Sequence, residues 1–313
     1  MADDSKPSYG GQAVIEGVMM RGPKYVSLAV RDPSGNICVK TEEVQSLSQR
    51  NWFTRLPVVR GALSLWESLT LGISKLLESA EIASPEEEKP TEGALTLSVL
   101  VAVVMALGLF IVLPSYGAQW IVDLASISGV HWVSFIESCL RLVILVLYVF
   151  AISKMEDIQR VFEYHGAEHK VIWAFENNQL PLGQNGNGAD QGFGDAVKLL
   201  AQKAQSESRL HPRCGTSFLF IAVLVTWVVF LFVTPESLVI RIISRIILLP
   251  VVAGLAYEVL KLSAVRSGFI WDMLKAPGMG MQKLTTKEPD LQQLEVAAVS
   301  LLSLIAEESG FSF

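Results

Sequence analysis

The hydrophobic residues of this chain are concentrated in four stretches, each long enough for a helix to cross a membrane. The stretches are residues 94–113, 132–152, 215–234 and 238–257. Because a helix rises about 1.5 Å per residue, about 20 apolar residues span a hydrocarbon core of roughly 30 Å. The pattern therefore predicts a mostly α integral membrane protein with four transmembrane helices.

Charged side chains interrupt only the second and the fourth stretch, at Glu137, Arg141, Arg241 and Arg245. Charges within a membrane usually pair with one another or face the interior of a helix bundle. We expect one inward-facing cluster in which Glu137 pairs with the arginines for structural reasons. The alternative is a pocket for a lipid headgroup or an anionic substrate.

Composition agrees with a membrane location. Of the 313 residues, 51% are hydrophobic and only 18% are charged, against roughly 25% charged in soluble proteins. A purely soluble protein is therefore excluded. The net charge of −6 also argues against a nucleic-acid partner, which would require a basic domain.

The distribution of lysine and arginine predicts the orientation. Ten of them precede the first stretch, seven lie in residues 153–214 and five follow residue 257, whereas residues 114–131 and 234–237 contain none. Positive residues collect on the cytoplasmic side of a membrane. We therefore expect a multi-pass protein of the bacterial inner membrane with both termini in the cytoplasm.

Residues 1–93 are expected to form a small cytoplasmic α/β unit. Two β-favouring runs, Val26–Arg31 and Ile37–Glu43, flank a turn sequence and predict a hairpin. A glycine-rich segment with Glu16 and Arg21 precedes them, and we expect these two side chains to fix a turn there. That segment is either a structural turn or part of a ligand site.

Two amphipathic helices are expected outside the four stretches. Apolar residues recur at helical spacing over 56–83, and this helix either anchors at the membrane surface or packs against the hairpin. An acidic linker connects it to the membrane domain of residues 94–257. A second helix, 291–307, lies in the cytoplasmic tail of residues 258–313. The polar glycine-rich run 183–194 is predicted to be a loop.

Three of the four histidines fall in the cytoplasmic segment 153–214. His165 and His169 belong to an H-x-x-E-H motif, in which two histidines four residues apart share one helix face and can reach the same metal ion. Glu168, between them, is placed to polarise water. This arrangement predicts a metal site, with zinc as the expected divalent ion.

A second motif, just before the third stretch, can complete the site. It contains His211, Arg213 and Cys214, and a catalytic zinc takes three protein ligands, so either His211 or Cys214 is expected to be the third. The competing interpretation is a hydrogen-bonded polar cluster that closes the helix bundle without a metal.

Several segments resemble one known family. They are GGQAVIEGVMMRGP, VVRGALSLWESL, YHGAEHK, HPRCGTSF and QKLTTKEPD, and they are similar to the YqhQ-like family of bacterial multi-pass membrane proteins, domain of unknown function 1385. The resemblance implies a metal-dependent enzyme without an established reaction. The matching positions are His165, Glu168, His169, His211 and Cys214.

The function expected from these observations is metal-dependent hydrolysis at the cytoplasmic face of the lipid bilayer. Glu168 would act as general base and Arg213 would stabilise developing negative charge. A site beside the membrane favours a lipid-linked or membrane-embedded substrate, which includes membrane proteins. The alternative is a non-enzymatic membrane scaffold or assembly factor.

Overall fold

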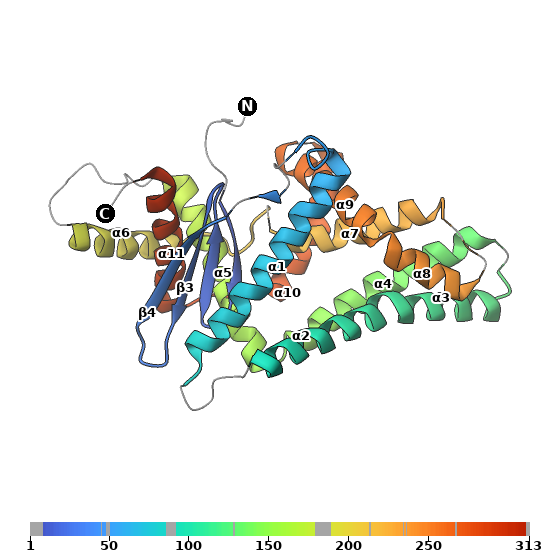
Figure 1. Cartoon of the computed structure of the whole chain (residues 1–313), viewed down its shortest axis with the longest axis horizontal. Coiled ribbons are helices and arrows are strands. Elements are labelled where there is room, and N and C mark those ends of the chain that lie inside the picture. The colour runs from blue at the N-terminus through green and yellow to red at the C-terminus, as the bar shows by residue number, and fades with distance from the viewer. Residues whose placement is uncertain are drawn as a thin grey trace.

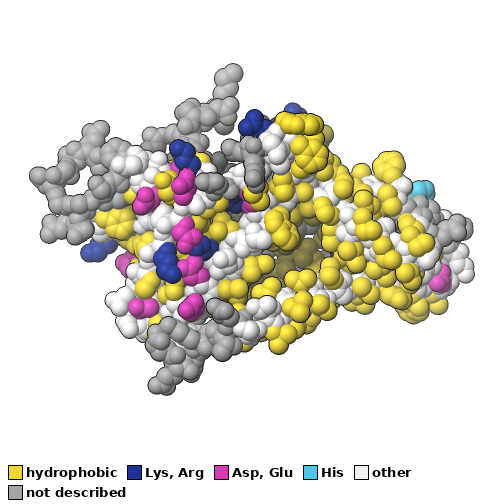
Figure 2. Space-filling model, in the orientation of Figure 1, with side chains coloured by type: hydrophobic (Ala, Val, Ile, Leu, Met, Phe, Trp, Pro, Cys, Tyr) yellow, Lys and Arg dark blue, Asp and Glu magenta, His cyan; other side chains and the backbone are white. Residues whose placement is uncertain are grey.

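The protein has one half built around a β-sheet and an elongated half built from helices (Figure 1); we call them the polar half and the apolar half. The computed structural model describes residues 9–44, 46–47, 51–85, 92–127, 129–178, 189–212, 214–233, 235, 237–266 and 268–310. Charged side chains gather over the sheet, and hydrophobic side chains cover the visible surface of the other half (Figure 2).

The sheet is a four-stranded antiparallel meander in the order β1-β2-β3-β4. Its strands are β1 (Gly10–Val14), β2 (Gly17–Arg21), β3 (Tyr25–Arg31) and β4 (Ile37–Glu43). The predicted hairpin is confirmed as β3 and β4, and the glycine-rich segment before it forms a second hairpin. Glycine is required at position 17, because a Cβ there would collide with the carbonyl oxygen of Ala29 on the paired strand.

The predicted pairing of Glu16 with Arg21 is wrong. Glu16 lies in the β1–β2 turn, and Arg21 lies at the far end of β2, opposite Gly10. The strand separates the two side chains. Glu16 instead forms an ion pair with Arg160, and Arg21 donates a hydrogen bond of 3.2 Å to Ser68.

Three helices lie on one side of the sheet and form the largest hydrophobic core. They are α5 (Glu156–Asn178), α6 (Ala189–Ala204) and α11 (Leu291–Ser309). Of these, α5 and α11 contact the strands, and α6 packs on these two helices. The predicted C-terminal helix is α11, and its buried residues pack against β2, β3, α5 and α6. This core therefore unites segments that lie far apart in the sequence. The run predicted as a loop through residue 194 is helical from Ala189.

The opposite face of the sheet packs against α1 (Pro57–Ala83). Leu71 and Leu76 of this helix contact a core that includes Val26 and Leu28. The predicted helix is confirmed, and its second half packs against the sheet. Toward its beginning Trp66 is 64% exposed, and there α1 crosses α9 so closely that Gly61 contacts the backbone of Gly254.

The apolar half consists of helices with several breaks. They are α2 (Glu92–Leu107), the π-helical segment η3 (Gly108–Val112), α3 (Leu113–Leu124), α4 (Val130–Ile152), α7 (Thr216–Phe230), α8 (Leu238–Ile247), α9 (Leu249–Val265) and α10 (Phe269–Thr285). Of these, α10 was not expected from the sequence.

Two of the described helices are long and apolar enough to cross a membrane, and a third exists if a bent pair counts as one span. The first span is Gly93–Leu124 and the second is His131–Ile152. The bent pair consists of α8 and α9, and the helix direction changes by 52° between them. The remaining predicted span, α7, has only 15 residues. The expectation of four spans is thus met only in part.

Proline explains where the first span changes its helical geometry. Pro114 cannot donate to the carbonyl of Phe110, four residues earlier, and its ring crowds that carbonyl. The helix widens into η3 at this point. The Phe110 carbonyl instead accepts a hydrogen bond of 2.8 Å from Nε of Arg141.

The expected buried charge cluster is present. Glu137 accepts from Arg141 at 2.8 Å on Oε1, and Arg245 donates to both of its carboxylate oxygens at 3.0 Å. Arg241 lies close by but donates to Gln119. The arrangement supports the structural interpretation, because Arg141 and Arg245 also donate to the backbone carbonyls of Phe110 and Val233.

Candidate metal centre

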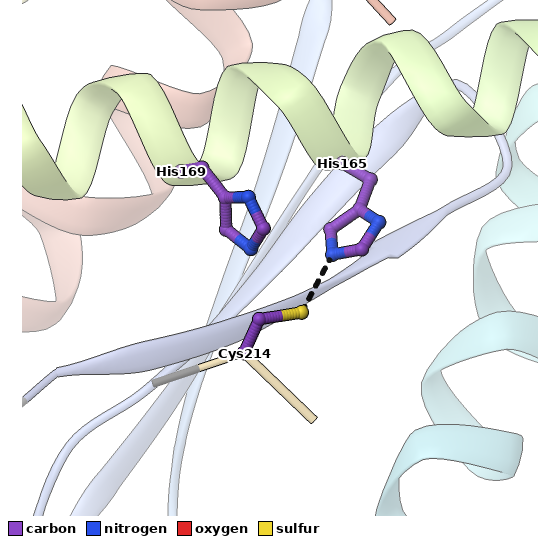
Figure 3. Close-up of side chains that lie close together, drawn as sticks. All are labelled: His165, His169 and Cys214. Carbon is purple, nitrogen blue, oxygen red and sulfur yellow. Dashed lines mark hydrogen bonds between the residues drawn. The ribbon is translucent and has the colours of Figure 1, made fainter. Parts of the chain in front are cut away.

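His165 and His169 project from one face of α5 toward Cys214, which lies just before α7 (Figure 3). The Sγ of Cys214 is 3.3 Å from Nε2 of His165. One ligand atom from each of the three residues lies within 4.8 Å of the others. Donor atoms around one tetrahedral zinc are roughly 3.3–3.8 Å apart, so small side-chain movements suffice to bind an ion.

The hydrogen bonds of the two histidines fix their tautomers. Nδ1 of His165 lies 2.8 Å from the carbonyl oxygen of Thr285, and Nδ1 of His169 lies 2.6 Å from that of Arg209. A carbonyl only accepts, so each Nδ1 must carry the proton. With Nδ1 carrying a proton, Nε2 is the ring nitrogen that each histidine can offer to a metal.

Nε2 of His169 provides the clearest sign of a missing ligand. This atom is buried and has no hydrogen-bond partner among the described residues. Leaving a buried polar atom unsatisfied typically costs about 1–3 kcal/mol. A cation in the space between His169, His165 and Cys214 would remove that cost.

Two groups of Thr216 hold the sulfur of Cys214 in place. The backbone N–H and the hydroxyl of Thr216 lie 3.5 and 3.4 Å from Sγ, and both donate to it. Thr216 is the first residue of α7, so the sulfur lies beside the N-terminus of that helix. A cysteine sulfur is a ligand that zinc commonly takes.

Glu168 faces the same cavity, which has a volume of about 380 Å³ and is also lined by His165, His169 and Cys214. Burial raises the pKa of Glu168 to about 6, opposed by the nearby His165 and by a hydrogen bond from the Gly11 backbone. Its Oε2 lies 3.9 Å from Nε2 of His165. Among the described residues, no lysine or arginine forms an ion pair with it. Its side chain is only 6% exposed, and it lines the cavity beside the candidate ligands.

His211 lines the cavity but does not belong to the group of convergent ligands. Its ring packs 4.7 Å from Trp173 and 5.7 Å from His169, measured between ring centroids. The side-chain amide of Gln282 bonds to both the N–H and the carbonyl of His211. Of the two ligands left open by the sequence, the geometry favours Cys214. Arg213 lies outside the described residues.

Other residues of the centre were not identified from the sequence. Gly11 approaches the side chain of Glu168 so closely that a Cβ would lie 2.9 Å from its Cγ. Thr285 and Arg209 act only through their backbone carbonyls, which no side-chain pattern reveals. A signal existed for Gln282 and Thr285, because both lie in the segment QKLTTKEPD that carries the family resemblance.

Gly166, inside the H-x-x-E-H motif, sets how closely α5 approaches the segment after α10. A Cβ at this position would collide with the carbonyl oxygen of Lys287. The same segment is held to α5 by a bond of 2.9 Å from the Lys287 N–H to the Phe162 carbonyl. Glycine thus allows the contact that brings Thr285 to His165.

We predict that Gly166→Ala lowers stability by about 1–3 kcal/mol, the usual cost of overpacking. Helix propensity alone predicts the opposite, a gain of about 1 kcal/mol. Thermal unfolding of purified protein in detergent distinguishes the two. Gly280→Ala on α10, where a Cβ would meet no atom within 4 Å, is the matched control. A midpoint for Gly166→Ala at or above that of the unchanged protein would contradict the close contact.

Comparison with known proteins identifies the family of the chain. The family described as "Protein of unknown function (DUF1385)" matches residues 56–185 and 191–307. The chain is 33% identical over 318 residues to the "Uncharacterized protein YqhQ" of Bacillus subtilis (strain 168), covering 97% of this chain and 94% of that protein. No solved structure matches. With matches over nearly its whole length, the chain belongs to the DUF1385 family.

Proposed function

We propose that the protein is a metal-dependent hydrolase that acts at the cytoplasmic face of the bacterial inner membrane. The observation that carries the proposal is the convergence of His165, His169 and Cys214 beside a buried carboxylate. Two imidazoles and a thiolate are a ligand set typical of zinc. A centre with three protein ligands leaves one position for water or substrate.

Glu168 is the proposed general base. Zinc supplies a Lewis acid that makes water more acidic. With a pKa of about 6, the Glu168 carboxylate is mostly ionised at pH 7 and can accept a proton from water in the cavity. It then returns this proton to the leaving group. Arg213 is proposed to stabilise the negative charge that develops on the substrate.

The substrate is proposed to be lipid-linked or embedded in the membrane. Cys214 lies two residues before the apolar helix α7, so the metal centre adjoins the apolar half. The finer topology, with four spans and both termini cytoplasmic, also belongs to this proposal. It requires α7 to cross the bilayer despite its length, and α8 with α9 to form one broken span.

A non-enzymatic scaffold is the second candidate. Hydrogen bonds from His165 and His169 join α5 to the end of α10 and to the segment before Cys214. The cluster could therefore hold the polar half against the apolar half without chemistry. Metal content and hydrolysis distinguish the two functions.

Protein purified without added metal is expected to contain about one equivalent of zinc. His165→Ala, His169→Ala and Cys214→Ser should each lose it, whereas His211→Ala should keep most of it. His131→Ala, at the exposed start of α4, is the matched control. Elemental analysis measures the content. Metal-free protein whose stability does not change with a chelator would support the scaffold instead.

Glu168→Gln is expected to retain zinc but to lose hydrolysis by at least about 100-fold, because general base catalysis commonly contributes 10²–10⁴-fold. The assay incubates zinc-loaded protein with a lipid extract of bacterial membranes and follows products by mass spectrometry. Glu156→Gln, an exposed residue on the same helix, is the control. Products that form equally with Glu168→Gln would rule out this base.

The proposed topology can be tested with a reporter that is active only outside the cytoplasm. A fusion between residues 124 and 130 should give signal, because that turn lies between the two longest spans. Fusions near Gln184 and at the C-terminus should remain silent. Signal from the Gln184 fusion would place the metal centre on the other side of the membrane.

A further inference from the structure

A second cavity, of about 790 Å³, lies between the first two strands, the beginning of α1 and the end of α9. This volume is within the range of roughly 300–1,000 Å³ that is typical of sites for small molecules. It is separate from the metal centre, although Gly10, Gly11 and Gln12 of β1 line both cavities. The edge strand thus lies between the two.

The cavity is positively charged in a chain whose net charge is −6. Four cationic side chains line it, namely Arg21, Arg55, Arg60 and Lys261. Two carboxylates oppose them. Glu67 is part of the lining, and Glu258 pairs with Arg60. Four positive charges against two negative ones leave a formal charge of +2.

The two carboxylates are already engaged in holding the walls together. Glu67 accepts from Ser46 at 3.1 Å and from the Leu47 N–H, which fixes the segment after β4, and it also pairs with Arg21 at 3.5 Å. Glu258 holds Arg60 with both of its oxygens. Lys261, in contrast, is exposed and forms no hydrogen bond or ion pair with a described residue. Its ammonium group can serve a ligand.

The surroundings of the cavity indicate what kind of anion it would take. Lys261 lies near the end of α9, which is part of the bent apolar pair. Trp52, Phe53 and Trp66, at and just before the beginning of α1, are 76%, 54% and 64% exposed. Exposed tryptophan beside basic residues is typical of the headgroup level of a membrane. Figure 2 shows lysine and arginine next to hydrophobic surface in this region.

We propose that this cavity binds a phosphate ester, with the arginines and Lys261 contacting the phosphate oxygens and the Ser64 and Ser68 hydroxyls adding neutral donors. Guanidinium groups match phosphate geometry with paired N–H donors. The ester is either the headgroup of a phospholipid or a soluble phosphate compound. Because its donors are distinct from the ligands of the metal centre, binding does not depend on zinc.

Calorimetric titration of the full chain in detergent tests this site with three probes. They are short-chain phosphatidic acid, short-chain phosphatidylcholine and glycerol 3-phosphate. Phosphatidic acid should bind more tightly than phosphatidylcholine. If glycerol 3-phosphate binds as tightly as phosphatidic acid, the ligand is a soluble phosphate ester. If it binds much more weakly, the ligand is a lipid headgroup.

Lys261→Ala should weaken the binding of phosphatidic acid about five-fold. This is the factor expected when one basic residue near an anionic lipid is removed. Lys261→Arg should restore binding. Lys198→Ala, an exposed lysine on α6, is the matched control and should have no effect. Equal affinity for all three probes, or unchanged binding by Lys261→Ala, would overturn the proposal. Cys214→Ser should bind phosphatidic acid as tightly as the unchanged protein. Loss of zinc binding and loss of phosphate binding can therefore be distinguished.

Discussion

The close contact between α5 and the segment that joins α10 to α11 is the constraint on which the candidate metal centre depends. Gly166 permits the approach because it has no side chain to meet the Lys287 carbonyl. The Phe162 carbonyl accepts from the Lys287 N–H at 2.9 Å, and Thr285 is thereby placed to orient His165. A substitution that separates these backbones would move the histidine, although no metal ligand had changed.

Backbone carbonyls released from regular structure determine much of the remaining architecture. In the apolar half, Pro114 releases the carbonyl of Phe110, and the guanidinium of Arg141 binds it. Arg141 needs a carboxylate in such surroundings, and Glu137 supplies one while also binding Arg245. In the polar half, carbonyls orient both histidines. Arg141, His165 and His169 would each be costly to bury without a hydrogen-bond partner. A backbone carbonyl outside the regular hydrogen bonding of a helix supplies that partner in each case.

Strand β1 relates the two cavities. It is the edge strand of the sheet, and its first half lines the metal centre and the cationic cavity. Gly10 and Gly11 have no side chains, so this part of the strand takes up little space between the two cavities. The backbone of Gly11 also forms a hydrogen bond with Glu168. A phosphate ester in one cavity would thus lie across a single strand from the proposed hydrolytic carboxylate.

The sequence by itself determined those features that depend on local periodicity. The β3–β4 hairpin, helix α1, helix α11 and the pairing of two histidines on α5 all follow from residue spacing within one segment. Only the tertiary structure decided which partner each segment meets. It brought Cys214, and not His211, together with His165 and His169. It also gave Glu16 the partner Arg160 and placed α11 in the largest core. The number of apolar spans also depended on the bend between α8 and α9 and on the short length of α7. These outcomes depend on contacts between residues far apart in the chain, which local hydrophobic patterns do not encode.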